Sequence, residues 1–209
     1  MNIQNKELQM ANNKKVNKRI ESTKKYIDEF QKENSKLNII RVDLGYTKPY
    51  SSEVTFEEAS NDLARMQNNM RSKPAVFKDK LGHIIKRECT EEKGIHFHAI
   101  LIYDGQKVQN STFKADQIGH YWENEITQGK GSYHNCHRNK YDRNGIGMLD
   151  HKDSDKRKIL DEQVLAYLCK DDQTIDSVKS NKKDRAFTRG TIVKSKKKLG
   201  RPRKNKPPL

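Results

Sequence analysis

Apolar residues are most concentrated between Gly94 and Tyr103, in a stretch that stops at the turn-forming pair Asp104-Gly105. A nearly unbroken apolar run of this length, ended by a turn signal, predicts a strand in the core of a sheet. Because side chains alternate along a strand, one face is apolar throughout and the other begins with two histidines. The apolar face consists of Ile95, Phe97, Ala99, Leu101 and Tyr103, and the other face of His96, His98, Ile100 and Ile102. We expect the apolar face to pack on a layer of helices.

A second strand is predicted over 83–90, immediately before this one. The polar residues after it lead to Gly94, so the two strands are expected to form a hairpin. If Glu88 pairs with His96 or His98, equal parity places its carboxylate on the histidine face, whereas a shift of one residue moves it to the opposite face. Alternate strand positions aim two imidazoles at one point, which suits a divalent metal ion. The alternative is a solvated pair of histidines at the end of a strand.

The spacing of apolar positions predicts the remaining elements. Alternation indicates a strand over 37–46, and a Thr55-x-x-Glu58 capping box precedes a helical stripe. The other predicted elements are helices near 14–33 and over 55–71, 114–127 and 159–172, and a short strand within 145–150. The polar, glycine-rich segment 129–145 is expected to be a loop. The helix near 14–33 either packs on the domain or lies along DNA.

Two groups of polar residues have more than one interpretation. Arg41 and Asp43 share a face of the first strand, and we favour an ion pair between them. The functional alternative is an arginine that contacts DNA and a carboxylate near the metal. A loop contains His134, Cys136 and His137, which are zinc-ligand types. No second cysteine pair stands at zinc-finger spacing, so a solvated loop is the favoured interpretation.

The composition indicates one medium-sized domain with polar tails. The 209 residues are 32% hydrophobic and 34% charged, so part of the chain is expected to lie outside the packed core. Thirteen Lys and Arg residues and one acid lie between Val178 and Leu209, which gives this segment +12 of the net charge of +15. A positive segment without an apolar face favours nucleic acid over a membrane. We expect an N-terminal helical arm over 1–36, a domain over 37–192 and a basic tail over 193–209.

The sequence also indicates a cellular location. No apolar run reaches transmembrane length, and no signal peptide opens the chain. Three scattered cysteines (Cys89, Cys136 and Cys169) are typical of reduced thiols rather than of a disulfide framework. We therefore expect the protein in the cytoplasm, without a membrane partner.

A tyrosine stands at the edge of the last predicted helix. Leu160, Val164 and Leu168 form the buried stripe, Tyr167 falls beside it, and Lys170 follows one turn later. Such a tyrosine is most often a packing residue with its hydroxyl in water. The edge of a packed stripe also places a rigid hydroxyl beside an adjacent site, where a lysine and a divalent ion would both favour the phenolate.

Together these motifs resemble those of the HUH endonucleases, which initiate rolling-circle replication, conjugative transfer and some transposition. The resemblance is carried by His96-Phe97-His98, by an acid eight residues upstream, and by Tyr167-x-x-Lys170. The amino-acid sequences of segments 41–44, 94–98, 167–170 and 185–190 look closest to those of replication initiators of filamentous phages (inoviruses) and related prophages. Positions four residues either side of Tyr167 are Gln163 and Asp171, so the chain resembles the single-tyrosine class.

The resemblance covers about 37–192 and implies both a fold and a reaction. The fold is of the α+β class, a five-stranded antiparallel sheet with helices packed on it, as in ferredoxin-like and RNA-recognition folds. In the implied reaction, His96, His98 and Glu88 hold Mg²⁺ or Mn²⁺, and Tyr167 cuts single-stranded origin DNA through a 5′-phosphotyrosine, assisted by Lys170. Arg41, Arg185 and Arg189 are expected to bind DNA. No helicase segment or phosphate-binding loop follows, so a host helicase and polymerase are expected partners, and the oligomeric state stays open.

The basic tail contains its own motif, Gly200-Arg201-Pro202-Arg203-Lys204. It resembles an AT-hook, in which an extended Arg-Pro-Arg segment enters the narrow minor groove of A·T tracts. The equally favoured alternative is a disordered basic tail that contacts phosphates without sequence preference.

Two other functions agree with the same sequence features. A single-tyrosine transposase or plasmid relaxase would use the same chemistry on transposon ends or a transfer origin. A non-catalytic DNA-binding regulator would keep the fold, bind DNA and leave it intact.

Overall fold

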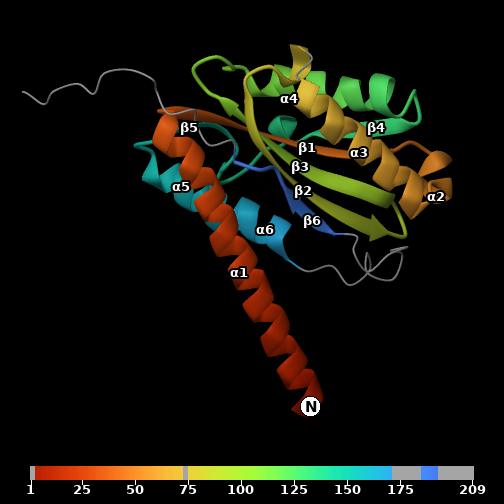
Figure 1. Ribbon diagram of the computed structural model, residues 1–209, viewed down its shortest axis with the longest axis horizontal. Helices are drawn as coiled ribbons and strands as arrows, with labels where there is room; N and C mark the ends of the chain where they lie inside the picture. Colours follow the sequence, from red (N-terminus) through yellow and green to blue (C-terminus); the bar gives the residue numbers. More distant parts are fainter. Residues whose placement is uncertain (1–2, 73–74, 171–184, 193–209) are drawn as a thin grey trace, which may run out of the picture.

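The apolar stretch forms the central strand of an antiparallel sheet. The computed structural model of the protein describes residues 3–72, 75–170 and 185–192. In it, β3 (Gly94–Asp104) lies between β1 (Lys36–Tyr46) and β2 (Lys80–Thr90) (Figure 1). Antiparallel partners on both sides satisfy the backbone of β3, and side chains on both of its faces are buried under helices. A strand in this position needs apolar side chains on both faces, which explains the nearly continuous run in the sequence.

The sheet contains six strands in the order β4-β1-β3-β2-β6, with β5 also paired to β1. β4 (Gly131–Asn135) pairs with residues 42–46 of β1, and β5 (Gly147–Asp150) pairs with residues 36–39, so these two short strands share one edge. β6 (Phe187–Arg189) forms the opposite edge beside β2. The predicted α+β class, an antiparallel sheet with helices packed on it, is confirmed. The sheet is five strands wide because β4 and β5 occupy one position.

One face of the sheet packs against α3 (Phe56–Ser72) and α4 (Ser111–Tyr121), which continues as a π-helical turn (Trp122–Ile126). The predicted stripe of α3 and the predicted apolar face of β3 meet in this core. The capping box also forms, because the Thr55 N–H donates to Glu58 Oε2 at 2.9 Å and the Glu58 N–H donates to Thr55 Oγ1 at 3.2 Å. Two short elements complete this side: α2 (Tyr50–Glu53) and a 3₁₀ turn (Ala75–Phe77).

The second face is covered by α1 (Ile3–Glu33) and by a helix in three parts. These parts are α5 (Ser154–Ile159), a π-helical segment (Leu160–Leu165) and α6 (Ala166–Cys169). Tyr26, Ile27 and Phe30 of α1 are buried in the core under this layer, while the N-terminal half of α1 extends away from the sheet (Figure 1). The helix predicted near 14–33 therefore packs on the domain. Among the described residues, no helix combines the length and apolar character needed to cross a bilayer.

Several boundaries differ from those predicted from the sequence. The segment 129–145 is not simply a loop, because it contains β4 and a 3₁₀ turn (Cys136–Arg138). β4 is a five-residue edge strand with mostly polar side chains, so it carries no apolar alternation from which to predict it. β6 is shorter still and was not predicted as a strand. The helices predicted to begin at residues 114 and 159 begin earlier, at Ser111 of α4 and Ser154 of α5. The side chains of Asn110 and Asp153 cap these earlier starts.

Gly94 fixes the turn between β2 and β3, and we predict that Gly94→Ala destabilises the protein. Its φ of +61° lies in the left-handed region, and a Cβ there would collide with the Ser51 carbonyl oxygen. We expect the free energy of unfolding, measured by urea denaturation, to fall by at least about 1 kcal/mol. Gly129→Ala is the matched control, because Gly129 has a φ of +88° but no neighbour within 4 Å of an added Cβ. An equal loss in both variants would contradict the role of the Ser51 collision.

Candidate active site

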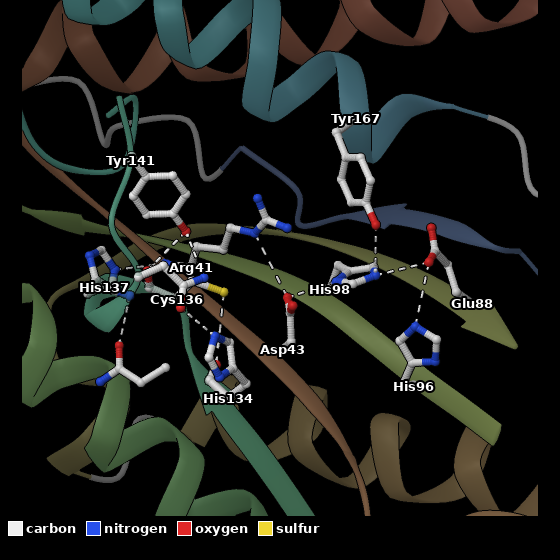
Figure 2. Close-up of polar contacts among 12 residues, drawn as sticks. Arg41, Asp43, Glu88, His96, His98, His134, Cys136, His137, Tyr141 and Tyr167 are labelled. Carbon is white, nitrogen blue, oxygen red and sulfur yellow. Dashed lines mark hydrogen bonds and ion pairs between the residues drawn. The ribbon is translucent and has the colours of Figure 1, made fainter. Parts of the chain in front are cut away.

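The pairing of β2 with β3 places Glu88 directly opposite His96, and Lys86 opposite His98. On the other side of β3, Asp43 of β1 lies opposite His98. Directly opposed residues of antiparallel strands project to the same face. Glu88 therefore shares the face of the two histidines, which is the equal parity of the two alternatives that the sequence allowed. This face looks toward α1, α5 and α6 (Figure 2).

Glu88, His96 and His98 form a compact group of metal-ligand types. The Nε2 atoms of His96 and His98 lie 3.5 and 3.0 Å from Glu88 Oε2, and one ligand atom from each residue lies within 4.8 Å of the others. Each Nδ1 atom faces an oxygen elsewhere: that of His96 is 3.0 Å from the Gly94 carbonyl, and that of His98 is 2.8 Å from Asp43 Oδ1. An acceptor at Nδ1 favours the proton there and leaves Nε2 as the ligand atom. The group can therefore hold a metal ion.

Charged neighbours set the protonation of this group. Burial alone would lower the pKa of His98, but contact with Asp43 and Glu88 outweighs burial and raises that pKa to about 9. Burial would raise the pKa values of Glu88 and Asp43, yet contact with the imidazoles holds both below their ordinary values. The buried ammonium of Lys86, which is ion-paired with Glu88, lowers the pKa of Glu88 further. An ion that binds at His98 Nε2 has to replace the proton there.

Tyr167 of α6 reaches this group from the helical layer. Its hydroxyl lies 3.5 Å from His98 Nε2, and Figure 2 shows the phenol pointing from the helix toward the imidazole. The side chain is 38% exposed, so it is accessible from solvent. Two cations flank the ring, because Arg41 Cζ and Lys86 Nζ each lie 5.4 Å from its centroid.

The structure brings together several residues selected from the sequence: Arg41, Glu88, His96, His98 and Tyr167. Lys170 lies just beyond α6, where its backbone N–H donates to the Tyr167 carbonyl at 3.3 Å and its side chain is exposed. The assistance that Lys170 gives to Tyr167 stays a prediction.

One residue of the site was not selected from the sequence, and another was left with two alternative roles. Lys86 was not selected, although its parity with Glu88 on β2 places it on the same face. The expected pair of Arg41 with Asp43 forms at 3.9 Å between Nε and Oδ1, but Asp43 lies closer to His98, at 2.8 Å. The carboxylate thus has both of the roles that the sequence left as alternatives, as partner of Arg41 and as neighbour of the metal-ligand group.

Arg185 and Arg189 line a different cavity, of about 1100 Å³, at the β6 edge of the sheet. Other cations of its lining are Lys25, Arg71 and Lys80, and Glu29 is the single acid among the described lining residues. The cavity is therefore strongly positive. The remaining residues predicted to bind DNA lie outside the described residues: Arg201, Arg203 and Lys204.

Along β1, a gap at residues 40–41 separates the segment paired with β4 from the segment paired with β5. In this gap the Arg41 N–H donates to His137 Nε2 at 3.1 Å, where a neighbouring strand would otherwise accept it. Cys136, the preceding residue, is buried. The interpretation as a solvated loop is therefore wrong for these two residues. Among the described residues, Glu88, His96 and His98 form the one group of at least three metal-ligand side chains. A zinc site built from His134, Cys136 and His137 therefore gains no support.

We predict that Mn²⁺ binds this protein through Glu88 and the two histidines. Glu88→Gln and His96→Ala should each weaken binding by at least about tenfold in calorimetric titration, because the first removes the negative charge of the carboxylate ligand and the second removes an imidazole ligand. His120→Ala is the matched control, since His120 faces Glu123 at 3.4 Å on the exposed surface of α4. Unchanged Mn²⁺ affinity in the Glu88 and His96 variants would place the ion elsewhere.

We also predict that His137 makes stability depend on pH. Burial lowers its pKa to about 4, below the ordinary value of 6.5, and its Nε2 must stay unprotonated to accept the Arg41 N–H. This stability is complete above about pH 6.5 and is lost as the pH falls toward 4. His137→Gln should therefore lose less stability than the wild type between neutral and acidic pH, by about 1 kcal/mol in chemical denaturation. Parallel losses in the two proteins would contradict this role.

Comparison with known proteins gives a family. The family model of the YagK/YfjJ C-terminal domain matches residues 2–190, a range that includes α1 and every strand of the sheet. No curated protein and no solved structure matches the chain. Because the match covers most of the 209 residues, the chain belongs to the YagK/YfjJ C-terminal domain family.

Proposed function

We propose that the protein initiates rolling-circle replication by nicking and rejoining single-stranded origin DNA through a 5′-phosphotyrosine. One observation carries the proposal: the Tyr167 hydroxyl lies 3.5 Å from His98 Nε2, an atom of the group that can hold a metal ion. A phenol at that position can meet a phosphate bound to the same ion. The resemblance of the sequence to the HUH endonucleases supports the same reaction.

The ligand set fits Mg²⁺ or Mn²⁺. Two imidazole nitrogens and one carboxylate oxygen leave coordination positions open for a substrate, nitrogen ligands favour Mn²⁺ in affinity, and Mg²⁺ is the more abundant ion. When bound, the ion would polarise the scissile phosphate and stabilise the charge that develops there. Asp43 holds the His98 ring in place for this purpose.

Tyr167 is the nucleophile in this proposal. Its oxygen forms a bond to phosphorus while the bond to the 3′ oxygen breaks, the phenolic proton passes to solvent, and the departing oxygen takes up a proton to give a 3′-hydroxyl. Arg41 and Lys86, each 5.4 Å from the ring centroid, stabilise the negative phenolate oxygen during attack. Lys170 would neutralise the phosphate. Because the phosphotyrosine keeps the energy of the broken phosphodiester, the strand can be rejoined without ATP.

Charge supports DNA as the partner. The net charge is +15, and the cavity lined by Arg185 and Arg189 at the β6 edge offers a surface for phosphates outside the reacting nucleotides. In this proposal the DNA enters single-stranded or extruded, the protein acts in the cytoplasm of a bacterial host, and a host helicase and polymerase extend the free 3′ end.

The test is a search for a covalent adduct. Overlapping single-stranded oligonucleotides from the source replicon are incubated with the protein and Mn²⁺, then separated on a denaturing gel. We expect one oligonucleotide to give a protein–DNA adduct that disappears with EDTA and with Tyr167→Phe. Tyr121→Phe is the control, because Tyr121 lies on α4, on the opposite face of the sheet.

Each outcome separates one function from another. An adduct that persists in Tyr167→Phe removes Tyr167 as the nucleophile. Cleavage confined to hairpin transposon ends or to a transfer origin would assign the chemistry to a transposase or a relaxase. Binding of every oligonucleotide without cleavage would favour the non-catalytic regulator.

A further inference from the structure

A small cavity lies beside Tyr167, on the side opposite Glu88 and His96. Its volume is about 290 Å³, at the lower end of the range for ligand pockets and too small for a large ligand. Figure 2 shows Arg41 and Tyr141 on this side of Tyr167, and Glu88 and His96 on the other. The lining residues are Arg41, Tyr141, Arg143, Asn144, Gly145, Ile146, Gln163, Val164 and Tyr167.

The lining has an unusual chemical composition. It includes two guanidinium groups, two carboxamides and two phenol rings, and no carboxylate among the described residues. The absence of an acid disfavours a cationic ligand, and the carboxamides suit a neutral group with both hydrogen-bond donors and acceptors. Flat aromatic side chains and arginine planes are the surfaces on which proteins stack unpaired bases. The composition therefore fits a nucleobase.

The walls of the cavity are held in place before any ligand arrives. The Tyr141 hydroxyl donates to the Cys136 carbonyl at 3.0 Å, and Asn144 Oδ1 accepts from the Ile146 N–H at 2.9 Å. A Cβ at Gly145 would lie only 2.7 Å from the Leu160 nitrogen, so the loop presses directly on the helix. Because its oxygen is occupied, Asn144 offers its amino group as a donor, while Gln163, one helical turn before Tyr167, is exposed and offers both donor and acceptor atoms.

We propose that this cavity takes the nucleobase next to the scissile phosphate and selects a purine. The proposal rests on the proposed nickase function for its place in the reaction, since Tyr167 belongs to both the cavity wall and the metal-ligand group. Purines are selected because arginine pairs with O6 and N7 of guanine, and asparagine or glutamine with N6 and N7 of adenine. Arg143 and Gln163 supply side chains for these pairs, and the Asn144 amino group donates to N7, an acceptor that both purines share.

The experiment measures binding without cleavage. Fluorescently labelled oligothymidylate, alone or with a single dG, dA or dC at its centre, is titrated with the full chain in EDTA, and affinity is read from anisotropy. We expect the strands with one purine to bind about tenfold tighter than oligothymidylate, an effect that corresponds to one good base contact. The strand with dC should bind like oligothymidylate.

Two variants and a matched control identify the cavity as the source of the preference. Asn144→Asp keeps the oxygen that accepts from the Ile146 N–H but loses the amino donor, and Gln163→Met removes the polar atoms at similar length. Both should reduce the purine preference to less than about threefold. Asn110→Asp introduces the same charge at the cap of α4 and should retain the preference, because its oxygen still accepts from the Phe113 N–H at 2.9 Å.

The outcomes separate this inference from the nickase proposal. Equal binding of all four strands, or a preference that survives in Asn144→Asp and Gln163→Met, overturns the purine pocket even if a covalent adduct forms. A purine preference that both variants abolish supports a purine-binding cavity even if no adduct ever forms. The titration is done without metal and measures binding alone, so its result does not depend on cleavage.

Discussion

The pairing of Glu88 with His96 across the β2–β3 hairpin is the constraint on which the site depends. A shift of one residue would turn Glu88 toward the core under α3 and leave the two histidines without its carboxylate. Gly94, whose backbone is in the left-handed region, holds this register at the turn. Its carbonyl oxygen also faces Nδ1 of His96 at 3.0 Å. One backbone position therefore determines both where the carboxylate stands and which nitrogen of the imidazole is available.

Two structural layers meet at the site. The metal-ligand group stands on the sheet, whereas Tyr167 stands on a helix anchored by the buried side chains of Leu160, Leu165 and Leu168. The π-helical segment before α6 changes the direction in which all later side chains point around the helix axis, compared with a regular α-helix. Tyr167 faces His98 as a result of that packing. The distance between phenol and imidazole is thus a property of the tertiary structure, which no single element determines.

Strong periodicity was sufficient to predict much of this arrangement from the sequence. The alternation of 94–103 and the stripe of α3 define the faces of the core, whereas the hairpin allowed either parity for Glu88 and left its register to the structure. Local patterns could not predict β4 or β6, because short edge strands with polar side chains carry little periodic signal. The contact of Asp43 with His98 crosses between β1 and β3 and depends on their register, which local patterns do not determine. The contact of Lys86 with Glu88 lies within β2, where the shared parity of the two residues permits it without requiring it.

The gap that His137 fills along β1 has a consequence for how such proteins can diversify. Pairing with β1 fixes the chain on both sides of the gap, at β4 and at β5, so the exposed residues 138–144 between them can change in length or composition without moving the sheet. Tyr141, Arg143 and Asn144 all lie in that interval. Related chains can thus alter the surface beside Tyr167 while the imidazoles and the carboxylate on β2 and β3 keep their positions.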